Sequence, residues 1–532
     1  MGLWSLYFFA KLLLYAGGHI GFHPALNLAF ALFTALPAAH ERLRLSKNLL
    51  AWPLALLLLY HDSYLPPFAR VLSAAPDLAG FSAKYLLELL LRVVDLRVVV
   101  DLALLIGIYV LARRKLRLAS FAIAGILLAW MVPLDALSLL RSSDAGSATP
   151  MADDSGSALE GLLAGGDRGY ATVGVIDAAL DRFLSTQAAR SVDWQTKASG
   201  EPFDVLILHV CSLSWDDLAS AGFEQDPLLS RFQLLFTRFN SAASYSGPAA
   251  IRLLRANCGQ SSHKRLYDRP QRNCLLFTGL EDAGFEPHWL MNHDGHFGNF
   301  FADVQQRGGM SVVPDAHQAA TVGLLAFDGT PVYDDYSTLS TWWATRLRSP
   351  APRVALYYNT ISLHDGNRPQ NAPELSGRAS YVLRLRRFFG GLGRFLDDLN
   401  ASGRRVVVVL VPEHGAAVRG DRLQIEGLRE IPTPAITEVP LAVAFIGLHS
   451  NSPSPLQRVT GPISYLALSQ LLARVVADNP FDGADRDLGA YAKGLPRTPF
   501  VSDNEGTVVM QVGRSVMMRP PEGAWTPWDT RR

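Results

Sequence analysis

The first 140 residues are dense in Leu, Ala, Val and Phe, whereas the chain after about residue 141 has the mixed composition of a soluble protein. Its apolar stretches lie near 3–22, 24–38, 48–62, 97–112 and 118–139. Several of them are shorter than the ~20 residues that a helix needs to cross a bilayer, so five is an approximate number of spans. The concentration of apolar residues predicts a transmembrane anchor over residues 1–140.

The charges between these stretches predict how the anchor is oriented. Lys and Arg gather in 41–47 and again in 113–117, and basic connecting segments of this kind face the cytoplasm. With five spans, both segments lie on the same side as the N-terminus, and the chain emerges from the last span on the opposite side. We therefore expect the C-terminal part to be extracytoplasmic, which for a bacterial inner-membrane protein means periplasmic.

Two further regions follow the anchor. Residues 141–169 are rich in Ser, Gly, Ala and Asp, which is typical of a flexible linker. Residues 170–532 alternate helical patterns with short apolar runs at 203–210, 354–358, 406–410 and 441–446. This alternation predicts an α/β domain with a mostly parallel sheet flanked by helices, and such sheets bind ligands beyond the carboxyl ends of their strands.

Chemically reactive side chains follow three of these runs. Cys211 follows the first run, His364 the second, and Glu413 with His414 the third. Between the first two runs, Ser246 opens a predicted helix whose free N–H groups would suit a phosphate. A serine in this position is most often a helix cap, but three such loops on one sheet edge favour a single active site with Ser246 as its nucleophile.

The overall charge excludes one class of function. The chain carries a formal net charge of +1. Proteins that bind nucleic acid usually show a basic patch or stripe, because the phosphate backbone is the main source of their affinity. The balanced composition therefore gives no reason to expect a nucleic-acid partner.

All three cysteines lie between residues 211 and 274. In an oxidising compartment, Cys258 and Cys274 could close a disulfide loop and leave Cys211 unpaired. An unpaired cysteine at the end of a strand has two interpretations. It is either a small buried apolar residue or a metal ligand.

The reactive residues at the strand ends suit a zinc ion. Zn²⁺ accepts thiolate, imidazole and carboxylate ligands, which Cys211, His414 and Glu413 would supply, and Ser246 could take the fourth position. Coordination would lower the pKa of the serine hydroxyl and favour an alkoxide nucleophile. Glu413 and His414 alone could form a polar turn after a buried strand, but their combination with Cys211 favours the metal site.

Three motifs resemble those of a known enzyme family. They are HVCSLSWDD at 209–217, SYSGPAA at 244–250 and PEHGAA at 412–417. They resemble the membrane-anchored phosphoethanolamine transferases of the alkaline phosphatase superfamily, and more narrowly their cellulose-modifying branch. The likeness extends over nearly the whole chain, including the multi-span anchor.

The resemblance implies a role for several residues. It implies that Cys211, Glu413 and His414 bind zinc with Ser246 as nucleophile, that His364 and Tyr245 lie close to the reacting phosphate, and that Cys258 and Cys274 form a disulfide. Arg429 occupies the place of an arginine that binds substrate in the family, although a surface arginine is an equal alternative.

The resemblance also implies a reaction. Phosphoethanolamine would pass from phosphatidylethanolamine to Ser246 and then to a glucosyl hydroxyl of cellulose, beside the inner-membrane cellulose synthase complex. Lipid A or another glycan is an alternative acceptor, and a non-catalytic scaffold of the cellulose secretion complex is an alternative function. A sulfatase fits less well, because Ala250 stands where sulfatases usually carry arginine.

One motif has no role in this scheme. It contains three histidines within nine residues, His288, His293 and His296. Surface groups are the favoured interpretation, ahead of a second metal site, and contact with substrate is left open. The aromatic residues of the same region could stack on a sugar, but core packing is favoured for each of them: Trp289, Phe297 and Phe300.

Overall fold

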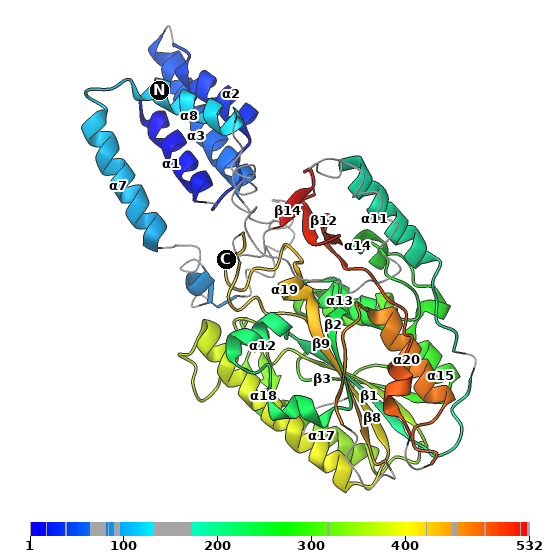
Figure 1. Cartoon of the computed structure of the whole chain (residues 1–532). Helices are drawn as coiled ribbons and strands as arrows, with labels where there is room; N and C mark the ends of the chain where they lie inside the picture. The colour runs from blue at the N-terminus through cyan, green and yellow to red at the C-terminus, as the bar shows by residue number, and fades with distance from the viewer. Residues whose placement is uncertain are drawn as a thin grey trace. The chain divides into compact units, whose positions relative to one another are not determined.

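The computed structural model describes residues 2–17, 19–37, 40–63, 81–82, 85–89, 96–131, 173–194, 196–315, 320–421, 423–448, 455–483, 486–521 and 523–528. The chain divides into two compact units, one formed mainly by the N-terminal helices and one formed by most of the remaining chain. Figure 1 shows the helices and strands of both units, coloured from blue at the N-terminus to red at the C-terminus. The predicted linker at 141–169 lies outside the described residues.

The N-terminal unit is helical. Its helices are α1 (Leu3–Ala16), α2 (Pro24–Ala35), α3 (Glu41–Asp62), α7 (Leu96–Ala112) and α8 (Leu118–Met131). Each coincides with one predicted apolar stretch, except that α3 also includes the basic segment expected to be a loop. Over the described part of the chain, no helix combines the length and the apolar character that crossing a membrane requires.

This unit also buries a charged pair among its apolar side chains. The Lys11 ammonium donates to Asp62 at 2.5 Å and to the Asn27 side-chain oxygen at 2.8 Å. All three residues are almost fully inaccessible to solvent. A buried ion pair is tolerated when both partners have hydrogen bonds, and here Asn27 also donates to the carboxylate of Asp62 at 2.7 Å.

The larger unit is built on a seven-stranded sheet in the order β10-β2-β9-β8-β1-β6-β3. The strands are β1 (Asp204–Cys211), β2 (Leu234–Asn240), β3 (Glu286–Met291), β6 (Val354–Thr360), β8 (Val406–His414), β9 (Glu438–Ile446) and β10 (Gln457–Val459). The prediction of a mostly parallel sheet is confirmed, because β9 alone runs antiparallel to its neighbours among these strands. Because β8 and β9 run in opposite directions, the segment that connects them leaves and re-enters the sheet at the same end of the strands.

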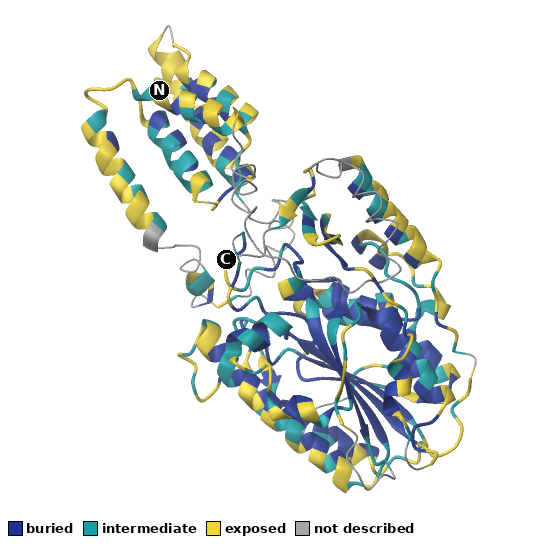
Figure 2. Cartoon of the chain, viewed as in Figure 1, coloured by how far each residue is buried: buried dark blue, intermediate teal, exposed yellow. Residues whose placement is uncertain are grey.

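The strands of this sheet are buried between helices on both faces (Figure 2), because their side chains are apolar on both sides. Val205 and Ile207 of β1 pack into one core with α13 (Ser246–Leu254), α15 (Leu276–Asp282) and α20 (Tyr465–Ala477). Leu206 and Leu208 face the other core with α12 (Trp215–Ala221), α17 (Asp335–Arg346) and α18 (Gly377–Ala401). Burial of each such side chain stabilises the fold by ~1.5–3 kcal/mol.

Smaller elements surround this three-layer body. A four-stranded antiparallel sheet packs with α11 (Val173–Ala188), and a three-stranded sheet forms separately. Their strands are β11 (Val501–Asn504), β12 (Thr507–Val512), β13 (Ser515–Arg519) and β14 (Thr526–Trp528), and β4 (Val322–Leu325), β5 (Pro331–Tyr333) and β7 (Arg368–Pro369). The remaining helices are α14 (His263–Leu266), α16 (Phe300–Ala302) and α19 (Pro434–Thr437), with short turns η1 (Pro227–Arg231), η2 (Arg272–Cys274), η3 (Phe297–Asn299), η4 (Asp303–Arg307) and η5 (Leu488–Ala492).

The expected disulfide is present, since Cys258 and Cys274 are bonded across 16 positions of the chain. A cross-link that closes a loop of this length restricts the unfolded chain and stabilises a fold by ~3 kcal/mol. The double variant Cys258→Ser/Cys274→Ser should therefore lose about that much free energy of unfolding, measured by denaturant titration. Reduction of the native protein should give the same loss, and an unchanged midpoint in both experiments would contradict the prediction.

Candidate active site

A β-bulge brings the predicted metal ligands together. Strands β1 and β8 run in regular parallel register up to Val210 and Pro412, after which Cys211 lies opposite His414. Glu413 is therefore the extra residue of the bulge, and such bulges often redirect side chains beside active sites. Possible ligand atoms of Cys211, Glu413 and His414 all lie within 4.8 Å of one another, and all three residues are buried.

The hydrogen-bond pattern leaves one atom of the histidine and one of the carboxylate with a lone pair that a metal could use. His414 Nδ1 lies 2.9 Å from the Gly415 carbonyl oxygen and must donate to it, so Nε2 keeps its lone pair. Glu413 Oε1 accepts from Asn359 Nδ2 at 2.6 Å. Its Oε2 atom is buried, lies 3.7 Å from His414 Nε2 and accepts no hydrogen bond from any described residue.

Burial disfavours the charged form of each residue in this cluster. It raises the pKa of the Cys211 thiol to about 12 and that of the Glu413 carboxyl to about 7. It also lowers the pKa of His414 well below its usual value. A bound cation reverses this preference, because it stabilises the thiolate, the carboxylate and the neutral imidazole together. The residues present therefore fit Zn²⁺, which accepts this combination of ligands.

Ser246 lies beside the same atoms. It is the first residue of α13, and its Oγ lies 3.3 Å from Cys211 Sγ and 3.5 Å from His414 Nε2. At the start of a helix, the amides of Ser246 and Gly247 have no acceptor within the helix and can bind an anion. The serine is only partly buried, so a substrate can reach it. The structure thus gathers all four predicted ligands at one helix start.

Two further predicted residues, Arg429 and Tyr245, line the same region. The Arg429 guanidinium lies 5.5 Å from the Tyr245 ring and donates to Ser212 Oγ at 3.4 Å, and the Tyr245 hydroxyl is 2.6 Å from Glu430 Oε1. Arg429 is buried, so the alternative of a surface arginine is wrong. It reaches the site because the connection between β8 and the antiparallel β9 remains at one edge of the sheet.

His364 is held in one tautomer. Its Nδ1 lies 2.7 Å from the Asp365 carbonyl oxygen and donates to it, which leaves Nε2 as an acceptor. Burial, together with the charge of Arg429, lowers the pKa of His364 to about 4. The imidazole is therefore neutral near neutral pH and can accept a proton from a hydroxyl group.

Two side chains near the candidate site were not predicted from the sequence. Asn359, the last residue but one of β6, donates to Glu413, although its type gave no chemical signal. Asp303 packs so close to the start of α13 that a Cβ on Gly247 would lie 2.9 Å from Asp303 Oδ2. A larger residue after Ser246 would therefore require the Asp303 carboxylate to move.

The three-histidine motif does not form a metal cluster among the described residues. His288 pairs with Asp315 at 2.8 Å, and the His296 side chain is 87% exposed, which agrees with the surface interpretation. His293 differs, because it is buried and its Nε2 lies 2.8 Å from Asn359 Oδ1. Trp289 and Phe300 belong to the core, as expected. The same expectation is wrong for Phe297, which is 42% exposed and packs against other rings such as that of Phe327.

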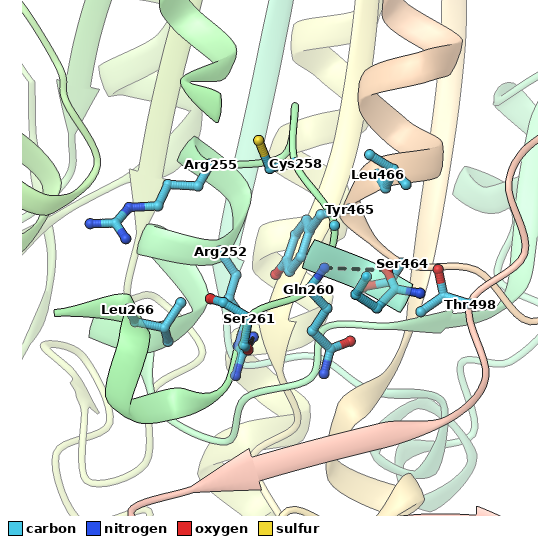
Figure 3. Close-up of a pocket in the computed structure, with 12 residues that line it drawn as sticks. Arg252, Arg255, Cys258, Gln260, Ser261, Leu266, Ser464, Tyr465, Leu466 and Thr498 are labelled. Atoms are coloured by element: carbon cyan, nitrogen blue, oxygen red, sulfur yellow. Dashed lines mark hydrogen bonds between the residues drawn. The ribbon is translucent and has the colours of Figure 1, made fainter. Parts of the chain in front are cut away.

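A separate polar cavity lies elsewhere on α13 (Figure 3). Its lining includes Arg252, Gln260, Tyr465 and Thr498. Arg252 comes from the same helix as Ser246, but none of the predicted zinc or catalytic residues lines this cavity. It is therefore distinct from the candidate active site.

Comparison with known families gives matches to both parts of the chain. Residues 167–525 match the family described as "Cellulose biosynthesis protein BcsG C-terminal domain", and residues 4–132 match the family described as "Cellulose biosynthesis protein BcsG N-terminal domain". Cellulose biosynthesis protein BcsG of Escherichia coli strain K12 is 37% identical over 99% of this chain and 96% of that protein.

Solved structures show more distant likeness. A protein in the alkaline phosphatase superfamily from Vibrio parahaemolyticus has a TM-score of 0.47 and 13% identity, covering 67% of this chain and 91% of that one. The soluble domain of lipooligosaccharide phosphoethanolamine transferase A from Neisseria meningitidis has a TM-score of 0.40 and 12% identity, covering 56% of this chain and 95% of that one.

Proposed function

The chain belongs to the BcsG family of cellulose biosynthesis proteins, and from this premise we propose that it is a zinc-dependent phosphoethanolamine transferase of the alkaline phosphatase superfamily. The donor is phosphatidylethanolamine, and the acceptors are glucosyl hydroxyls of cellulose in the periplasm. The observation that carries the proposal is the position of Ser246 Oγ, 3.3 Å from Cys211 Sγ and 3.5 Å from His414 Nε2 at a helix start.

Ser246 is the nucleophile of the first step. Cys211, Glu413 and His414 would hold Zn²⁺, which would lower the pKa of the Ser246 hydroxyl and neutralise charge on the phosphate oxygens. Ser246 Oγ attacks phosphorus, the bond to the diacylglycerol oxygen breaks, and phosphoethanolamine remains on the serine. The free amides at the start of α13 and the charge of Arg429 hold the non-bridging oxygens through this displacement.

In the second step, a sugar hydroxyl attacks the same phosphorus and Ser246 leaves. His364 accepts the proton of that hydroxyl on Nε2, the atom that its hydrogen bond to Asp365 leaves free. Its lowered pKa keeps Nε2 unprotonated near neutral pH, so this atom is available to accept a proton. In the first step, His364 Nε2 accepts the proton that leaves the Ser246 hydroxyl and passes it to the diacylglycerol oxygen.

A membrane anchor would keep the site at the leaflet that supplies the lipid donor, and this anchor stays a prediction from hydropathy. The chain keeps the nucleophile and all three other proposed ligands, which favours an enzyme over a non-catalytic scaffold. The decisive experiment incubates the full-length protein with labelled phosphatidylethanolamine and, separately, cellulose or lipid A. Label on cellulose supports the proposal, label only on lipid A corrects the acceptor, and no transfer contradicts it.

Arg429 offers a test of phosphate binding. Arg429→Ala should lower kcat/KM by ~10²–10³-fold, the usual loss when one donor to a transition-state oxygen is removed. Arg429→Lys should fall between this variant and the native protein, because lysine keeps the charge without the bidentate geometry. The matched control is Arg419→Ala, which removes an arginine paired with Asp216 near the surface. Equal effects of both alanine variants on transfer would contradict the assignment.

A further inference from the structure

We propose that His293 is a positioning residue that orients the carboxylate of Glu413 through the side chain of Asn359. The inference deepens the proposed function, because it rests on Glu413 being a zinc ligand. It assigns a role to one member of the three-histidine motif, which the proposed mechanism does not use. The chain of contacts starts at a backbone amide and ends at the carboxylate.

The hydrogen bond from the Gly295 amide to His293 determines which atom donates in the two hydrogen bonds that follow. The Gly295 amide donates to His293 Nδ1 at 3.1 Å, so the ring proton must lie on Nε2. His293 Nε2 then donates to Asn359 Oδ1 at 2.8 Å. With its oxygen fixed in this way, Asn359 turns its Nδ2 toward Glu413 Oε1, at 2.6 Å.

Without His293, the orientation of the amide would be less strongly fixed. Asn359 is fully buried, and its two ends differ only in whether they donate or accept. In the flipped orientation, its oxygen would face the Glu413 carboxylate, where two acceptors repel each other. The contact with His293 opposes this flip, because it supplies a donor that only Oδ1 can use.

The backbone holds the histidine in place. Strand β6 lies between β1 and β3, and the Asn292 amide donates to the Asn359 carbonyl oxygen at 3.2 Å just after β3 ends. Gly295 has a φ of 72°, in the left-handed region that favours glycine, and this turn directs its amide back toward His293. The ring therefore has a partner on each nitrogen and is not free to bind a metal itself.

These contacts determine which carboxylate oxygen of Glu413 is available to bind a metal. Asn359 occupies Glu413 Oε1, whereas Oε2 is buried, has no hydrogen-bond partner among the described residues and faces His414 Nε2 at 3.7 Å. His293 thus keeps the free oxygen directed at the proposed metal position. Hydrogen-bond partners of this kind typically change metal affinity by ~10–100-fold when they are removed.

The test measures zinc affinity of the full-length protein by competition with a chromophoric chelator. His293→Phe keeps a ring but removes the donor, and it should weaken zinc binding by ~10–100-fold. His293→Gln can donate from a similar position and should restore most of the affinity, which a role in packing alone would not predict. His296→Phe is the matched control, because that side chain is exposed, and it should bind zinc like the native protein.

A double-mutant cycle tests the route through Asn359. If His293 acts through it, adding His293→Phe to Asn359→Leu should cost no further affinity. Full additivity, or native affinity in His293→Phe, would overturn the inference while leaving the proposed zinc site intact. Failure of the native protein to bind zinc would instead overturn the proposed function itself, so the two failures are distinguishable.

Discussion

Replacing Ser246 with alanine should abolish phosphoethanolamine transfer, with a loss of at least ~10⁴-fold in kcat, as found when nucleophiles of covalent catalysis are removed. The reason is geometric. Ser246 Oγ is the one hydroxyl within hydrogen-bond reach of both Cys211 Sγ and His414 Nε2 among the described residues. A water molecule in its place could support slow hydrolysis, but it cannot retain the phosphoethanolamine group covalently.

The measurement follows both the product and the intermediate. Native protein incubated with labelled phosphatidylethanolamine should carry label on the peptide that contains Ser246, and Ser246→Ala should carry none. Ser244→Ala is the matched control, because it removes a buried hydroxyl two positions earlier that lies outside the proposed ligand set. A labelled intermediate in Ser246→Ala would contradict the mechanism.

The parts of the site that could be predicted from sequence share one property. Cys211, Glu413 and His414 directly follow apolar runs, and the carboxyl ends of parallel strands meet at one edge of a sheet. Local pattern therefore placed them together. The bulge that sets Cys211 opposite His414 could not be predicted, because it depends on the register between two strands that are distant in sequence.

The positions of Arg429 and His293 could not be predicted from the local sequence pattern. Arg429 lies in a connection with no strong periodicity, and its burial depends on β9 returning antiparallel, whereas the sequence suggested another parallel strand. His293 belongs to a polar loop that resembles a surface segment. Its role depends on Asn359, 66 positions away, and on a tautomer fixed by the amide of Gly295. The resemblance pointed to Arg429 but left a surface arginine as an equal alternative, and its burial decides between them. The role proposed for His293 follows only from its spatial partners.

Loss of the proposed zinc ion should abolish transfer activity. Purified full-length protein should carry about one zinc ion per chain, and Cys211→Ser should lose it together with transfer activity, because the remaining ligands lack the thiolate that zinc prefers. Treatment with a chelator should inactivate the native protein, and added zinc should restore it. The control is Cys258→Ser/Cys274→Ser, which removes two cysteines outside the proposed ligand set and should retain zinc where it folds.

Proton release identifies the thiol as the ligand. Burial raises the pKa of Cys211 to about 12, so zinc must displace its proton, and binding should tighten as the pH rises. Glu413, with a pKa of about 7, also releases a proton near neutral pH, so the measurement is made at least one pH unit above that value, where the carboxyl is already ionised. Under that condition, calorimetry in buffers of different ionisation enthalpy should detect the proton that leaves Cys211 when zinc binds. His414→Ala should still release this proton if enough affinity remains to measure it, since burial keeps the imidazole neutral and it has none to give up. Zinc affinity that does not change with pH would mean that Cys211 is not a ligand, and a purely apolar role for its buried side chain would then be the better interpretation.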